Sequence, residues 1–224
     1  MSQLTFDLPV REARGREDFF VAPSNATAVA ALEAWQEWPL GKMVLTGPKG
    51  SGKTHLAHVW VQMTGGVLTA ADAVTTEAVP ALAKAGHVVA EDADRGELDE
   101  RALFHLHNAL AEASGALLLT ARAAPRDWRL ALPDLLSRVS AASVARLDAP
   151  DDTLLQAVIL KQFADRQVTV TPDLIDWLLA RIERSFDAAS RAVEALDSAA
   201  LAKGRPVTRA LAREVLDSLS PPRG

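Results

Sequence analysis

One short segment combines glycines, a lysine and a hydroxyl residue in the order that phosphate binding requires. It runs Gly47-Pro48-Lys49-Gly50-Ser51-Gly52-Lys53-Thr54, two glycines separated by four residues and followed by Lys and Thr. Glycines let successive backbone N–H groups converge on phosphate oxygens, and the start of a helix adds roughly half a positive charge. Lys53 can then reach the outer phosphates, and the Thr54 hydroxyl can bind Mg²⁺. We therefore predict a site for ADP or ATP with Mg²⁺.

The residues on either side of this loop have the patterns of a strand and a helix. The apolar run Met43–Thr46 predicts a buried strand that leads into the loop. Residues 55–63 continue as a helix with one apolar face, formed by Leu56, Val59, Trp60 and Met63. The glycine, lysine and threonine pattern reliably indicates phosphate binding only when a strand precedes it and a helix follows it, as predicted here.

Another apolar run, at residues 87–90, ends in carboxylates. Glu91 and Asp92 follow it directly. Ligands of a parallel sheet gather at the carboxyl ends of its strands, so we expect both side chains to face the phosphate loop. One carboxylate would bind Mg²⁺, directly or through water, and the other would polarise the attacking water. Asp94 and Asp99 are expected to cap the next helix instead.

Strand and helix patterns alternate along the first two thirds of the chain. The remaining strands are predicted at residues 67–69, 116–120 and 143–147, and the helices at 26–38, 77–85, 101–113 and 133–138. This alternation predicts a three-layer α/β domain with a five-stranded parallel sheet. From Asp151 onward the apolar period is helical, which predicts a small all-helical lid domain. The expected divisions are an arm and linker at 1–18, the α/β domain at 19–150 and the lid at 151–224.

Composition excludes several classes of protein. Among 224 residues, 49% are apolar and none is cysteine, so disulfides and thiolate metal sites are excluded. No apolar run approaches the roughly 18 residues of a membrane span, and no signal peptide is evident, so we expect a cytoplasmic protein without a membrane partner. The formal net charge is −5, and no basic cluster is present. Direct sequence-specific binding of nucleic acid is therefore not expected.

These features together resemble the AAA+ ATPases, and the details are similar to the nucleotide domain of the replication initiator DnaA. The similarity rests on Gly52-Lys53-Thr54-His55-Leu56, on Glu91 and Asp92, and on Leu135-Leu136-Ser137-Arg138. The resemblance adds His55 to the nucleotide-binding segment. It implies that Arg138 is an arginine finger donated across a subunit interface to ATP bound by a partner. It also implies that Arg184 contacts the nucleotide from the lid.

The N-terminal arm narrows the resemblance. Residues 3–8, Gln-Leu-Thr-Phe-Asp-Leu, resemble the hexapeptide that binds the β sliding clamp of DNA polymerase III, with Gln3, Leu4, Phe6 and Leu8 as the docking side chains. Because the predicted arm, α/β domain and lid take up the 224 residues, we expect no helix-turn-helix domain of the kind that follows the lid in DnaA. A clamp motif joined to a DnaA-like ATPase without that domain resembles the Hda-type regulatory inactivators of DnaA. The partners implied are DnaA and the DNA-loaded clamp, which would associate the protein with the nucleoid.

Phe6 and Asp7 differ from the residues commoner in the clamp motif, and two positions of the nucleotide domain also depart from the family pattern. Glu91 stands where the initiator usually has Asp, which displaces the carboxylate by a methylene, so we expect weak intrinsic hydrolysis of ATP. At the end of the strand at 116–120, where the family has Asn or Asp, only Thr120 is a polar candidate. AAA+ surfaces associate readily, and a homodimer is left open.

Two other functions remain open at this point. The chain could be an ATPase in its own right, such as a helicase loader that remodels a replication complex. Robust turnover without DnaA would favour that reading. The chain could instead be an interaction module that holds nucleotide structurally and bridges the clamp to another protein. Normal activity of an Arg138→Ala variant would favour the second alternative.

Overall fold

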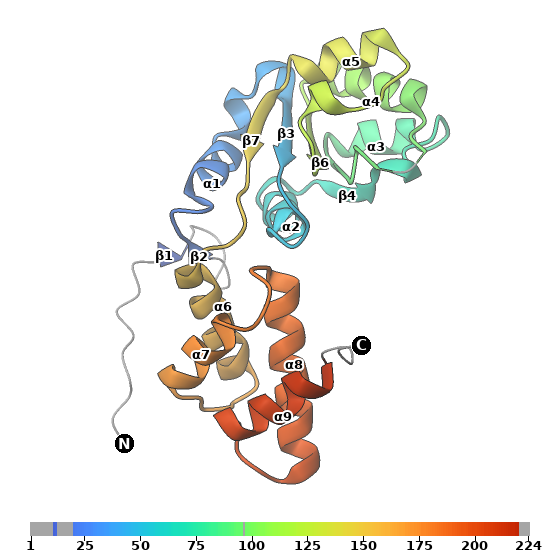
Figure 1. Cartoon of the computed structure of the whole chain (residues 1–224). Coiled ribbons are helices and arrows are strands. Elements are labelled where there is room, and N and C mark those ends of the chain that lie inside the picture. The colour runs from blue at the N-terminus through green and yellow to red at the C-terminus, as the bar shows by residue number, and fades with distance from the viewer. Residues whose placement is uncertain (1–10, 13–19, 96, 220–224) are drawn as a thin grey trace. The chain divides into compact units, whose positions relative to one another are not determined.

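The structure is a computed structural model that describes residues 11–12, 20–95 and 97–219. The chain divides into two compact units. The first is an α/β unit of residues 25–148, and the second joins the described residues before 25 to the helices that follow residue 148. Figure 1 colours the elements along the chain. Each unit is described below by itself.

A five-stranded parallel sheet forms the centre of the α/β unit. Its strands are β3 (Lys42–Thr46), β4 (Val67–Ala70), β5 (His87–Glu91), β6 (Ala116–Ala121) and β7 (Ser143–Arg146). Their order across the sheet is β4-β5-β6-β3-β7, and every neighbouring pair is parallel. The predicted fold class is confirmed. The order also places β6 between the strand that leads into the phosphate loop and the strand that ends in carboxylates.

The strand register fixes which residues lie level at the carboxyl edge of the sheet. Thr46 of β3 pairs with Ala121 of β6, and the next residue, Gly47, donates its N–H to the Ala121 carbonyl at 3.2 Å. On the other side of β6, Ala90 of β5 pairs with Leu119. The residues that follow β3, β5 and β6 therefore emerge side by side at one edge.

Helices cover both faces of this sheet and complete the three layers. Alternate strand residues, including Val44, Val88, Leu117 and Leu119, share one core with α4 (Glu100–Glu112) and α5 (Pro133–Ser140), and α3 (Val79–Ala85) packs beside α4. The helix α2 (Lys53–Thr64) packs against β4, β5 and β6, and α1 (Ala26–Glu33) packs against β7. A side-chain period of two along each strand explains how one strand contributes side chains to both faces of the sheet.

The first helix is shorter than the sequence pattern predicts. The expected span was 26–38, but α1 ends at Glu33 and is followed by two 3₁₀ turns at Trp35–Glu37 and Pro39–Gly41. Pro39 disfavours the helical conformation at the residue before it, and Trp38 is accordingly extended, with φ −65° and ψ 134°. The turns bring Trp38 onto Trp60 of α2, with ring centroids 5.4 Å apart in a stacked arrangement.

In the described part of the second unit, four helices surround a core of their own. They are α6 (Asp152–Asp165), α7 (Pro172–Leu179), α8 (Phe186–Lys203) and α9 (Arg209–Leu219). Fully buried apolar side chains include Phe163, Ile175, Leu196 and Leu211. The side chains of Asp151 and Ser185 cap α6 and α8 by accepting backbone N–H bonds. An antiparallel pair of two-residue strands, β1 (Arg11–Glu12) and β2 (Phe20–Val21), belongs to the same unit.

Candidate functional site

The phosphate loop joins β3 to α2, and its glycines are required by the backbone. A Cβ at Gly47 would lie 2.3 Å from the Leu147 carbonyl oxygen and 2.9 Å from Ser51 Oγ, so a side chain there would collide with the backbone that follows β7 and with the loop itself. Gly50 and Gly52 have φ angles of 74° and 95°, a region that residues with a Cβ rarely adopt. The loop therefore folds tightly over the start of α2.

Lys53 lies inside this loop. Its side chain is buried, and Nζ donates to the carbonyl oxygens of Gly47 and Pro48 at 2.8 Å each. Burial is the main cause that lowers the pKa of Lys53, while the negative charge of Asp92 opposes it and the positive charge of Arg122 adds to it. The loop carbonyls thus hold the ammonium by hydrogen bonds. When a nucleotide binds, the ammonium can donate to phosphate oxygens in their place.

The other predicted nucleotide-binding residues lie in the loop itself or in the first turn of α2. Pro48 and Lys49 are exposed, and Thr54 and His55 are exposed in the first turn of α2. Ser51 is buried, and its Oγ has no hydrogen-bond partner among the described residues. A buried hydroxyl without a partner is costly, and an oxygen-rich ligand in the loop would satisfy it.

The two predicted carboxylates have different surroundings. Glu91 is half-buried at the end of β5. Asp92 is exposed and has a φ of 58°, which its N–H bond to Thr120 Oγ1 at 3.1 Å helps to hold. The Asp92 carboxylate pairs with Arg95 at 3.2 Å. Asp92 is nevertheless the carboxylate with the strongest effect on Lys53.

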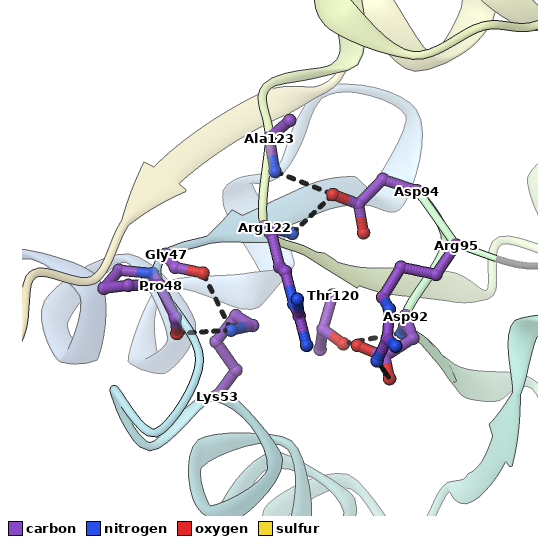
Figure 2. A network of polar contacts seen from close by, with 9 residues as sticks. All are labelled: Gly47, Pro48, Lys53, Asp92, Asp94, Arg95, Thr120, Arg122 and Ala123. Atoms are coloured by element: carbon purple, nitrogen blue, oxygen red, sulfur yellow. Dashed lines mark hydrogen bonds and ion pairs between the residues drawn. The ribbon is translucent and has the colours of Figure 1, made fainter. Parts of the chain in front are cut away.

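Asp94 does not cap the next helix as the sequence predicted, and Asp99 alone does so by accepting from the Ala102 N–H at 2.9 Å. Instead, Asp94 Oδ2 accepts the N–H groups of Arg122 and Ala123, each at 2.8 Å (Figure 2). The reason is the sheet order, because β5 and β6 are neighbours and their loops meet at the carboxyl edge. Asp94 therefore holds the turn after β6 onto the turn after β5.

Arg122 belongs to the candidate site but was not among the predicted site residues. It follows β6 directly, and its side chain extends toward Lys53 in Figure 2. The rule that ligands gather at strand ends also applies to it. What the sequence could not supply was the position of β6 in the sheet. Thr120, the expected polar candidate, is buried and accepts the Asp92 N–H.

The remaining predicted residues belong to other parts of the chain. Arg138 lies on α5, is exposed, and forms no ion pair within the described part of the chain. Arg184 belongs to the helical unit, where its guanidinium donates to both carboxylate oxygens of Asp152 at 3.0 and 2.9 Å. The clamp-binding residues Gln3, Leu4, Phe6 and Leu8 lie outside the described residues. The roles of all these side chains stay predictions.

The donor set at the strand ends suits Mg²⁺ bound together with phosphates. Across residues 11–12, 20–95 and 97–219, no group of three or more His, Asp or Glu side chains could hold a metal by itself. Mg²⁺ typically keeps several waters and is bound by one or two carboxylates plus substrate phosphates, and a phosphate-loop hydroxyl can add a further ligand. Thr54 at the loop and Glu91 and Asp92 at the end of β5 are of the type and number that such an ion uses.

The sheet order, the phosphate loop and the helical unit define the AAA+ fold. No family model matches the sequence. Domain III of the replication initiation protein DnaA from Thermotoga maritima is similar in structure, with a TM-score of 0.76 and 18% identity over 90% of this chain and 95% of that one. AMPPCP-bound DnaA from Aquifex aeolicus has a TM-score of 0.69 and 17% identity over 91% of this chain and 68% of that one. A RuvB variant, T158V, from Thermotoga maritima has a TM-score of 0.69 and 17% identity over 89% of this chain and 70% of that one.

Among the described residues, no helix is long and apolar enough to cross a membrane.

Proposed function

We propose that this chain is a nucleotide-binding AAA+ protein of replication that promotes hydrolysis of ATP bound to DnaA, as Hda-type regulators do. The similarity to DnaA domain III, with 95% of that chain covered, supports the replication context. The fold similarity to an AMPPCP-bound DnaA supports a nucleotide as the ligand of the phosphate loop. In our proposal this ligand is ATP or ADP with Mg²⁺.

The chain's own site would serve mainly to bind nucleotide. Residues 47–55 would hold the phosphates, and Arg184 would contact the nucleotide after leaving Asp152. Glu91 and Asp92 would bind Mg²⁺ and orient water. The ion pair of Asp92 with Arg95 at 3.2 Å engages one of the two carboxylates, which agrees with weak intrinsic hydrolysis.

The exposure of the Arg138 guanidinium is the observation that most supports a role in stimulating ATP hydrolysis by DnaA. The helix α5 is anchored by Leu135 and Val139, both almost fully buried. Arg138 lies between these anchors in sequence but is exposed, without an ion pair in the described part of the chain. A rigid helix that presents an unpaired arginine suits donation in trans to a partner's ATP, where it would stabilise charge on the transferring phosphoryl group.

The arm at residues 3–8 would bind the β sliding clamp through Gln3, Leu4, Phe6 and Leu8. A clamp loaded on DNA would then raise the local concentration of this protein near DnaA without a new contact between the two. This tether would place a cytoplasmic protein at the nucleoid.

The test measures hydrolysis of DnaA-bound ATP in the presence of DNA-loaded clamp. The wild-type protein should accelerate it, and Arg138→Ala should remove most of the acceleration, since arginine fingers contribute ~10³ to 10⁵ in rate elsewhere. Deletion of residues 3–8 should abolish the clamp dependence. Arg126→Ala, which truncates another exposed arginine of the same unit, is the matched control and should behave as wild type.

Other results would favour the competing functions. Robust turnover of ATP without DnaA would indicate an autonomous ATPase such as a helicase loader. In that function Glu91 and Asp92, which act electrostatically on Lys53, would bind Mg²⁺ and polarise the attacking water. Unchanged stimulation by Arg138→Ala would indicate a bridging module. Absence of stimulation by the wild type would reject the proposed function.

A further inference from the structure

The helical unit has a groove of about 850 Å³ among α7, α8, α9 and the segment that joins α7 to α8. This volume is typical of clefts that bind a small molecule or a few side chains of a partner. Two buried alanines of α8, Ala188 and Ala192, line the groove. The half-buried side chains of Ile182 and Leu216 lie beside them. The groove therefore offers apolar surface to an occupant.

Trp177 of α7 is the largest side chain in the lining of this groove, and its indole N–H lacks an acceptor. The residue is 6% exposed, and Nε1 is buried without a hydrogen bond to any described residue. Buried tryptophans usually find a partner for this N–H, because an unpaired donor costs free energy. An oxygen atom of an occupant would remove that cost after a small shift of the side chains that cover the ring.

Arginine side chains surround Trp177. The guanidinium carbon of Arg181 lies 4.2 Å from the centre of the indole ring, and that of Arg209 lies 5.8 Å from it. Arg181 Nη1 also donates to the Trp177 carbonyl at 3.1 Å. Arg213, one turn after Arg209 on α9, lines the groove together with Arg181. None of these three arginines forms an ion pair with a described residue, so their charges are open to an anionic group.

The groove also contains acidic side chains, which limit the anions that it can accept. Glu183, Glu194 and Asp217 line it, and none of them forms an ion pair with a described residue. A nucleic acid strand or a run of acidic residues would bring several negative charges next to these carboxylates, and like charges repel. A single carboxylate can approach the arginines without this repeated repulsion. The charges of the lining thus favour an occupant with one acidic group.

We propose that this groove binds a short segment of a partner protein in which one acidic side chain is flanked by apolar side chains. The apolar side chains would pack on Ala192, Ile182 and Leu216. The carboxylate would pair with Arg181 and Arg213, since a guanidinium can donate two N–H bonds to one carboxylate. Arg181 is already held on the indole, so little side-chain ordering is needed on binding. The inference is independent of the proposed function, because none of the residues assigned to the nucleotide lines the groove.

The test follows the indole N–H signals of the full-length, isotope-labelled protein by NMR during titration with synthetic peptides. The sequence contains five tryptophans, and Trp177→Phe identifies the signal of Trp177. The probe is the blocked peptide acetyl-Ala-Leu-Glu-Phe-Ala-amide, which should shift this signal saturably. The same peptide with Gln in place of Glu should bind about fivefold more weakly, the loss expected for an exposed ion pair. Polyglutamate of the same length and a short single-stranded DNA should also bind more weakly than the probe.

Variants of two exposed residues on α9 test the charges of the groove. Arg213→Gln should weaken binding of the glutamate peptide by about fivefold and leave the glutamine peptide nearly unchanged. Asp217→Asn removes a like charge and should strengthen binding of the glutamate peptide by about twofold. Arg205→Gln is the matched control and should bind as wild type, because Arg205 pairs with Glu214 at 3.7 Å and does not line the groove. Melting temperatures check that the variants fold.

The outcomes distinguish this occupant from others. Selectivity for the glutamate peptide that is lost in Arg213→Gln would support the inference. Absence of a saturable shift at Trp177, or equal affinity for the glutamate and glutamine peptides, would overturn it. Tighter binding of polyglutamate or DNA would assign the groove to polyanions instead. A shift of the Trp177 signal that grows with protein concentration alone would assign it to a second copy of this chain.

Discussion

At the scale of single residues, two buried basic side chains at the amino end of the sheet, His107 and Lys42, have strongly lowered pKa values. His107 of α4 is 2% exposed, and its pKa is lowered to about 4, mainly by burial and then by the charge of Lys42, with Arg138 adding to the effect and Asn108 opposing it. Lys42 at the start of β3 is 3% exposed, and burial lowers its pKa to about 8. Its Nζ donates to the Gly115 carbonyl at 3.4 Å.

His107 should make the stability of the α/β unit depend on pH. The folded form holds it neutral below its ordinary pKa of 6.5, so the unfolded chain binds more protons between pH 6.5 and 4. Stability is therefore full above pH 6.5 and falls as pH decreases toward 4, by on the order of 3 kcal/mol from this residue. Urea unfolding of wild type and His107→Leu at both pH values measures the difference.

The variant should lose much less stability over this range than wild type. His105→Gln, which changes an exposed histidine of the same helix, is the control and should keep the wild-type dependence. An equal pH dependence in His107→Leu would show that His107 is not the titrating group.

At the scale of elements, a single carboxylate fixes the start of α5, the helix that carries Arg138. Glu100, the first residue of α4, accepts the Ala131 N–H at 2.9 Å and the Leu132 N–H at 2.6 Å. Both donors lie immediately before Pro133, where α5 begins. A side chain of α4 therefore fixes the segment that leads into α5. The apolar packing of Leu135 holds α5 in addition.

Replacing Glu100 should make the segment before α5, residues 131–132, more mobile. Glu100→Ala removes both acceptors, and the loss of two charge-assisted bonds at a partly exposed site should reduce local stability by about 1–2 kcal/mol. Hydrogen exchange at the amides of Ala131 and Leu132 should speed up by about tenfold. In the stimulation assay, the same variant should lower the activity that depends on Arg138.

Glu112→Ala, at the exposed other end of α4, should leave both measurements unchanged. Unaltered exchange at Ala131 and Leu132 in Glu100→Ala would mean that packing alone positions α5.

At the scale of the whole molecule, each of the two compact units has hydrophobic core residues of its own among the described residues. One core joins alternate residues of β3, β5 and β6 to α4 and α5, and the other is formed by α6 to α9 around Phe163 and Leu178. Each core is made within one compact unit. A local defect in one core should therefore have its main effect on the elements of that unit.

Phe163→Ala should destabilise the helical unit by about 3–5 kcal/mol, because Phe163 is fully buried and truncation leaves a cavity. Hydrogen exchange should accelerate across α6 to α9 and stay near the wild-type rate in β3, β5 and β6. Leu201→Ala, on the same unit but 85% exposed, should change neither. Equal acceleration in the sheet would indicate that the two units unfold together.

The sequence by itself determined the phosphate loop, the number of strands in the main sheet and the helical character of the second unit. These features are local. Glycines at fixed spacing, apolar runs bounded by turn residues and a helical apolar period are all set by neighbours along the chain. For the same reason the capping role of Asp99 was predicted correctly, since an N-cap binds a backbone N–H only a few residues away.

Only the tertiary structure decided which strand ends meet and what their side chains bind. The order β4-β5-β6-β3-β7 has no local signal, and it alone places the residue after β6 against the phosphate loop. Because of the same strand order, the Asp94 carboxylate accepts hydrogen bonds from the Arg122 and Ala123 N–H groups and does not cap a helix. A hydrogen bond between residues 28 apart depends on how strands pair across the sheet. Arg122 could therefore be assigned to the site only when the fold was known.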